Sequence, residues 1–141
     1  MPRRSSVHTF NCGLYLVRGV DREEPSANFV HGFPGKDCGV PVLTSHYWLQ
    51  TVVQTHALVA LDIADPEHPR EVFRVTFGDD EEPHWLATDP SGRRLVLNSA
   101  GYTKSNRLFV INFDPRTARH RRDRKTRRRV YLLIFRLGGT G

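Results

Sequence analysis

The sequence has few cysteines and no long hydrophobic run. Cys12 and Cys38 are the only cysteines in the chain. They are too few for the disulfide framework of a small secreted domain, and they can form one disulfide, two free thiols or two metal ligands. No stretch approaches about 18 consecutive apolar residues, so no transmembrane helix is expected. Residues 1–10, MPRRSSVHTF, have no apolar run behind their positive charges. No secretory signal is therefore expected, and the predicted location is the cytoplasm.

Common catalytic and phosphate-binding motifs are also missing. The sequence has no CxxC, HxH or HExxH spacing, and neither Ser91 nor Ser99 lies in a G-x-S-x-G context. The segment FPGK at residues 33–36 precedes a predicted strand instead of a helix, so it is not a phosphate-binding loop. The sequence motifs therefore identify no candidate catalytic residue.

Positive charge is concentrated in the last part of the chain. Of the 21 Lys and Arg residues, 10 fall in residues 116–141, beside a single acidic residue, Asp123. Residues 1–115 carry 11 basic and 14 acidic side chains, a net charge of −3. The high isoelectric point is thus a property of the tail, and the body shows no charge signature of nucleic-acid binding.

Short runs of alternating apolar residues indicate β-strands. No stretch shows a sustained helical spacing of apolar residues, and clusters of Asp, Pro, Gly and Asn separate the runs. The pattern predicts an all-β fold. Strands are expected at residues 7–10, 14–18, 27–32, 40–44, 47–53, 58–63, 71–77, 84–88, 94–98 and 108–112.

The strand pattern repeats at the spacing of β-propeller blades. LYLV at residues 14–17 recurs 44 residues later as LVAL and a further 50 residues later as LFVI, and known propeller repeats take about 40 to 50 residues per four-stranded blade. We predict about two and a half four-stranded antiparallel blades: a partial blade at 6–33, a full blade at 38–77 and a partial blade at 83–114. A closed ring needs about four to eight blades, so this ring is incomplete. A small antiparallel meander or sandwich is the alternative.

Two segments resemble known bacterial propellers. HALVALDIADPEHPREVFRVTFG (56–78) resembles repeats of the selenium-binding-protein and LVIVD-repeat type. PHWLATDPSGRRLVLNSAG (83–101), followed by RLFVINFDPRT, resembles the lactonase-like (YVTN) propellers. The resemblance covers about residues 10–117 and implies a fold shared by many activities. If a longer parent protein is an enzyme, it implies a metal-dependent oxidoreductase or a lactonase-like hydrolase.

The resemblance stops at Arg116. Residues 116–141 form a basic tail, which is interpreted either as frame-shifted text from a GC-rich gene or as a genuine segment for nucleic acid or anionic lipid. In both cases YLLIFRL, at residues 131–137, is expected to replace the outer strand of the last blade.

Four residues form a candidate metal site. Cys12 and His56 occupy equivalent turns 44 residues apart, while Cys38 and His84 each open an innermost strand. If these turns converge at the mouth of a central channel, two thiols and two imidazoles suit copper or zinc, and the selenium-binding resemblance implies metal-dependent sulfur chemistry. The alternative is that both cysteines are small buried residues, His84 caps a strand and His56 is a solvated turn residue.

Two further groups of residues have mainly structural interpretations. The acidic run 79–82 can attract calcium but is typical of a solvated loop. Four aromatic residues are expected to fill the interfaces between blades: Tyr47, Trp48, Phe77 and Trp85.

The sequence predicts a partial propeller with a ligand- or metal-binding role in a longer parent and no complete activity of its own. A non-catalytic protein-interaction module is the alternative, and nucleic-acid binding through the arginine-rich tail is a third. Because an open stack of blades leaves its flanking faces uncovered, self-association is expected.

Overall fold

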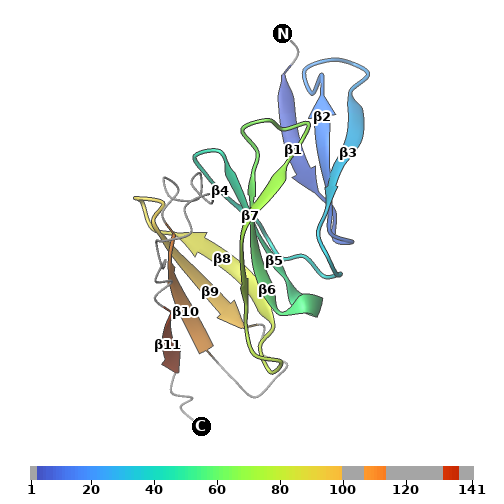
Figure 1. Cartoon of the computed structure of the whole chain (residues 1–141). Helices are drawn as coiled ribbons and strands as arrows, with labels where there is room; N and C mark the ends of the chain where they lie inside the picture. Colours follow the sequence, from blue (N-terminus) through green and yellow to red (C-terminus); the bar gives the residue numbers. More distant parts are fainter. Residues whose placement is uncertain (1–2, 100–106, 114–131, 137–141) are drawn as a thin grey trace.

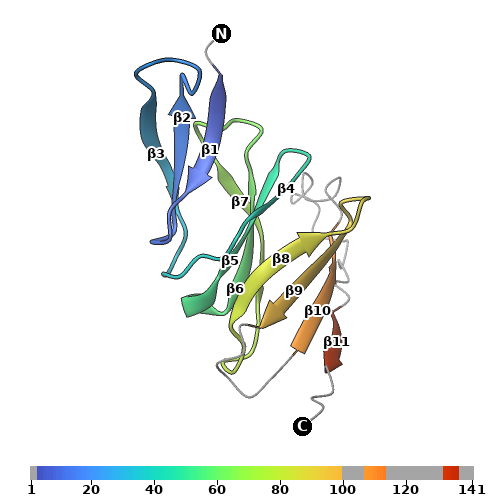
Figure 2. The same ribbon diagram turned by 180° about the vertical axis from the view of Figure 1, so that it is seen from behind.

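The chain folds into three antiparallel β-sheets that follow one another in chain order. The computed structural model describes residues 3–99, 107–113 and 132–136. Figures 1 and 2 show the second sheet lying between the first and the third. The predicted all-β class is confirmed, and the only helix in the described residues is a single 3-10 turn, Val53–Thr55. The described part of the chain has no helix that is long and apolar enough to cross a membrane.

Each sheet is a meander in which every strand pairs with the next strand along the chain. The first sheet consists of β1 (Arg4–His8), β2 (Gly13–Arg18) and β3 (Ser26–Gly32). The second consists of β4 (Val42–Thr44), β5 (Tyr47–Val52), β6 (Ala57–Asp62) and β7 (Arg70–Thr76). The third consists of β8 (Pro83–Thr88), β9 (Arg94–Ser99), β10 (Arg107–Asn112) and β11 (Leu132–Arg136).

All ten expected strands are present, and only the first and fourth have an end that is shifted by more than one residue. The first strand was expected to reach Phe10 but ends at His8, because residues 9–12 form a tight turn in which the Cys12 amide donates to the Thr9 carbonyl over 2.8 Å. The fourth begins at Val42, although Cys38 forms an isolated bridge with Val52 ahead of it.

The expected outer strand of the last sheet is confirmed by β11. It pairs antiparallel with β10, with Leu108 opposite Phe135 and Ile111 opposite Leu132. The remainder of the basic tail, residues 116–131 and 137–141, lies outside the described residues.

The 44-residue repeat is visible in the backbone. Cys12 and His56 both adopt left-handed conformations, with φ of 65° and 51°. The Cys12 carbonyl accepts a hydrogen bond from the Phe33 amide at 2.9 Å, and the His56 carbonyl accepts one from the Phe77 amide at 2.7 Å. These two turns are therefore structurally equivalent, as the spacing predicts.

The core lies in two layers, one at each junction between sheets. Every residue of β5 and β6 is buried, because the second sheet has a neighbour on both faces. Its alternate residues divide between the layers. The layer against the first sheet includes Cys12, Leu14, Phe33, Cys38, Trp48, Val52, Ala57, Val59 and Leu61. The layer against the third includes Tyr47, Leu49, Leu58, Ala60, Phe77, Leu86, Leu95, Leu97, Phe109, Ile111 and Phe113.

Adjacent residues of β9 provide a direct test of this alternation. Leu97 is fully buried in the second layer, whereas Val96 faces outward with 37% of its surface exposed. We expect Leu97→Ala to lower the free energy of unfolding by about 2–5 kcal/mol, since it leaves a cavity. Val96→Ala should cost less than about 1 kcal/mol. Urea unfolding of both variants checks the assignment, and equal losses would contradict it.

Candidate functional site

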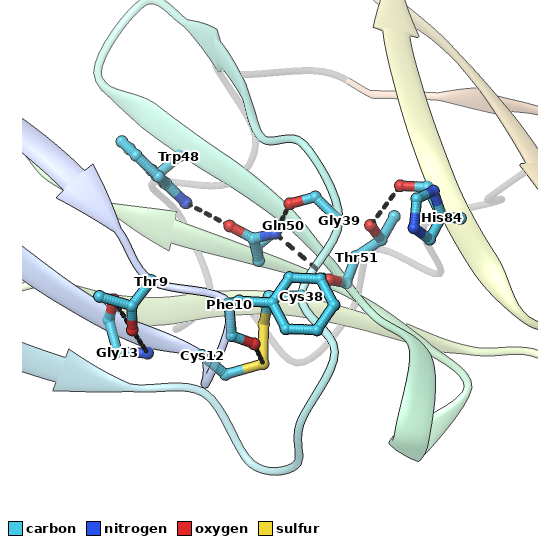
Figure 3. The surroundings of a disulfide bond; sticks show 10 residues. All are labelled: Thr9, Phe10, Cys12, Gly13, Cys38, Gly39, Trp48, Gln50, Thr51 and His84. Atoms are coloured by element: carbon cyan, nitrogen blue, oxygen red, sulfur yellow. Dashed lines mark hydrogen bonds between the residues drawn. A yellow bond between two sulfur atoms is a disulfide. The ribbon is translucent and has the colours of Figure 1, made fainter.

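The two cysteines form a disulfide that joins the first sheet to the second. Cys12 lies in the β1–β2 turn and Cys38 lies ahead of β4, with 26 residues of separation, and both are buried (Figure 3). Of the three states open to the cysteines, the structure shows the disulfide. The described residues contain no free thiol.

A buried polar network lies beside the disulfide on the second sheet. The side-chain amide of Gln50 donates to the Gly39 carbonyl at 2.5 Å and accepts from the Trp48 indole at 3.1 Å (Figure 3). A Cβ atom at Gly39 would overlap the carbonyl oxygen of His84. Because Gln50 is fully buried and its polar atoms are paired, this network holds the backbone in place and leaves no donor for a ligand.

The junction between the second and third sheets has a polar link where the first junction has a disulfide. The imidazole Nδ1 of His56 lies 2.5 Å from the carbonyl oxygen of Glu81. The Glu81 side chain is almost fully buried and pairs with the Arg107 guanidinium at 2.6 Å. A buried carboxylate that loses its cationic partner is costly, so Arg107 and Glu81 form a structural ion pair at this junction.

The four candidate metal residues therefore belong to two different junctions. Cys12 contacts Cys38 at the first junction, and His56 contacts Glu81 at the second. The His84 carbonyl accepts a hydrogen bond from the Thr51 hydroxyl at 2.8 Å, while the buried imidazole Nδ1 of His84 has no hydrogen-bond partner among the described residues. The Cys12 and His56 turns each reach the sheet that follows them, and the disulfide leaves neither cysteine as a thiol. Among the described residues, no three His, Cys, Asp or Glu side chains lie close enough to hold a metal ion.

Glu81 is a residue that sequence reasoning misplaced. The acidic run 79–82 was interpreted as a solvated loop, yet Glu81 has only 2% of its surface exposed. Its partner Arg107 is 26 residues away. No local pattern distinguishes this acid from its neighbours.

Two histidines of the first sheet, His8 on β1 and His31 on β3, have pKa values lowered by burial. Desolvation is the main cause for both His8 and His31. The carbonyl of Gly39 partly opposes it at His8, and Glu71 partly opposes it at His31, where Arg74 adds to the lowering. The buried Nε2 of His31 has no hydrogen-bond partner in the part of the chain that the structure describes, so protonation of this ring is unfavourable in the folded chain.

The outer face of the first sheet is apolar and uncovered in the described structure. Val7, Tyr15 and Phe29 lie opposite one another across β1, β2 and β3, and Val17 pairs with Ala27 in the next row on the same face. Tyr15 and Phe29 pack edge to face with ring centroids 5.6 Å apart. Phe29 is 60% exposed. We call these five residues the first outer face.

The outer face of the third sheet is also apolar. Ala87, Val96 and Val110 lie opposite one another across β8, β9 and β10, and Trp85 and Leu108 flank this row. We call these five residues the last outer face. Tyr47, Trp48 and Phe77 are buried between sheets as expected, but the expectation was wrong for Trp85, which is 57% exposed. The reason is that Trp85 faces away from the second sheet.

Comparison with known proteins identifies no relative. No protein-family model, curated protein or solved structure matches this chain. The resemblance to selenium-binding and lactonase-like propellers therefore stays a prediction.

Removal of the disulfide should weaken the first junction. Closing a loop of this length lowers the conformational entropy of the unfolded chain, which raises the free energy of unfolding by about 3 kcal/mol. We expect the Cys12→Ala/Cys38→Ala double variant to lose about that much free energy of unfolding. Dithiothreitol should bring the wild type to the same level and leave the variant unchanged. Equal urea midpoints for oxidised and reduced wild type would contradict the disulfide.

The partly buried histidines His8 and His31 predict a loss of stability in mild acid. Since the folded-state pKa of His31 lies below its unfolded value of about 6.5, the unfolded chain binds more protons as pH falls below that value. The free energy of unfolding should therefore decrease from about pH 7 to about pH 5, and His31→Gln should reduce the decrease.

His68 is the matched control of opposite sign. Its hydrogen bond to Asp65 raises its pKa, so it adds stability in acid that is lost as pH rises through the raised value. His68→Gln should make the decrease toward acid larger. Urea unfolding at a series of pH values tests both variants, and identical slopes for the two would contradict the assignment.

Proposed function

We propose that this chain is a non-catalytic interaction module, made of three consecutive propeller blades, whose first outer face binds a β-sheet surface of another polypeptide. The observation that carries the proposal is a difference in solvent exposure between residues at equivalent positions of two sheets. Tyr15 and Val17 lie at least partly exposed on β2, whereas Val59 and Leu61, 44 residues later on β6, are fully buried against the first sheet.

The blade interpretation is supported by order, spacing and stacking. Each sheet is a meander, equivalent strands recur after 44 and 50 residues, and the sheets pack face to face through two apolar layers. A propeller ring needs about four to eight such sheets, so three sheets leave one uncovered face at each end. An uncovered apolar sheet face is the type of surface that marks a protein interaction site.

A ligand- or metal-binding role in a longer parent has less support. It depends on Cys12, Cys38, His56 and His84 sharing one site, and these residues lie at two junctions with the thiols joined. Nucleic-acid binding depends on residues 116–129, which lie outside the described residues.

An apolar dye tests whether the first outer face is available for binding. We expect the anionic dye ANS to fluoresce with the wild type at a dilution where light scattering reports a monomer, because exposed apolar surface binds it. The Val7→Gln/Phe29→Gln variant should lose a measurable part of this fluorescence, and dye bound to the last outer face should account for the remainder. Its free energy of unfolding should change by less than about 1 kcal/mol, since both side chains are exposed.

The matched control is Val40→Gln/Leu43→Gln. Val40 and Leu43 are about as exposed as Val7 and Phe29 but lie outside the first outer face. This control should keep most of the dye signal. Equal fluorescence from the wild type and the Val7→Gln/Phe29→Gln variant would refute the proposed function.

A further inference from the structure

We infer that the polypeptide bound by the first outer face is a second copy of this chain, joined head to tail through its last outer face. The inference rests on the proposed function and names its partner. It follows from the repeat. Two junctions between sheets form within the chain, and the first and last outer faces are the two sides of a third junction of the same kind.

Each sheet packs against the sheet that follows it through residues at equivalent positions. Leu58 and Ala60 on β6 are buried against the third sheet. Leu108 and Val110 stand 50 residues later on β10, at the same positions, and belong to the last outer face. This face therefore matches the surface on which another sheet packs.

Every sheet also uses the same positions to contact the sheet before it. Val59 of the second sheet packs against the first, and Phe109 of the third packs against the second. Their equivalent in the first sheet is Tyr15, which belongs to the first outer face. One copy thus has two surfaces without a neighbouring sheet, the first outer face and the last outer face. These two faces correspond to the two sides of each junction inside the chain, so they are expected to pack against each other.

Charged residues at the edge of the sheets support this head-to-tail order. At the first junction, Glu67 in the seven-residue β6–β7 loop pairs with Arg18 at 2.6 Å and with Arg4 at 3.5 Å in the preceding sheet. The β2–β3 loop has the same length, and Glu23 occupies the position of Glu67.

The last sheet offers the matching cation. Arg94 lies opposite Asn112 at the edge of the last outer face, as Arg4 lies opposite Arg18 in the first sheet. Glu23 and Arg94 are both exposed, and neither forms an ion pair within the described residues. In a head-to-tail complex, Glu23 of one copy would meet Arg94 of the other.

The two faces are different surfaces, so the contact is heterologous and cannot have two-fold symmetry. Head-to-tail contacts of this type produce rings when the rotation closes and open chains when it does not. A first-face to first-face dimer would be isologous instead. The two arrangements respond differently to substitutions confined to one face.

Complementation between single-face variants tests the inference. Phe29→Glu impairs only the first outer face and Trp85→Glu only the last, and both residues are exposed, so folding should be retained. Sedimentation velocity of the full chain over a concentration series should show dimers or larger species for the wild type and monomers for each variant. An equimolar mixture of the two variants should give a dimer and nothing larger, because a single pair of intact faces remains.

Two further sets of variants test whether the effect is specific to the two outer faces. Leu43→Glu adds the same charge at an equally exposed apolar residue outside both faces and should associate like the wild type. Arg94→Glu and Glu23→Arg should each weaken association by a few-fold, as expected for exposed ion pairs, and the double variant should restore it. These two variants retain both apolar faces, so they also test the head-to-tail order if a glutamate variant fails to fold.

Three results would overturn the inference. They are a wild type that is monomeric at every concentration, a Trp85→Glu variant that dimerises like the wild type, and a mixture that stays monomeric. A monomeric wild type whose dye fluorescence is reduced by Val7→Gln/Phe29→Gln would leave the proposed function standing with a different partner. Unchanged dye fluorescence would remove the proposed function itself.

Discussion

Face-to-face packing of apolar sheets is the interaction on which the rest of this structure depends. The second sheet has no solvent-facing side along β5 and β6, and apolar residues predominate in these two strands. Such a sheet cannot be stable alone, because both of its faces require a neighbour. The order of the three sheets and the burial of Tyr47, Trp48 and Phe77 between them both follow from this requirement.

The two junctions use different chemistry at equivalent positions. A left-handed turn residue reaches the following sheet in both cases, as Cys12 through a disulfide to Cys38 and as His56 through a hydrogen bond to the Glu81 carbonyl. The turn geometry is therefore a property of the repeat, while the side chain at its tip is free to vary. The equivalent positions of Cys12 and His56 are thus accounted for by the turn geometry of the repeat.

The sequence predicted the all-β class, ten strands and the repeat, because alternation and spacing are local and periodic signals. It did not predict how turns meet neighbouring sheets, which depends on contacts between distant segments. Cys12 and Cys38 illustrate this limit, since their spacing is compatible with a bond, two thiols or ligands. Glu81 illustrates it as well, because its burial depends on Arg107 and His56. Trp85 was assigned to an interface by residue type, although its strand parity directs it outward.

The disulfide lies at only one of the two junctions, which makes the chain mechanically asymmetric. In a linear stack, each sheet contacts its neighbours alone, and local opening begins where the coupling between neighbours is weakest. The first and second sheets are covalently tied, whereas the third is held by its apolar layer and a few polar links. Separation of the stack should therefore begin with detachment of the third sheet, and the first two sheets form the last cooperative unit to open.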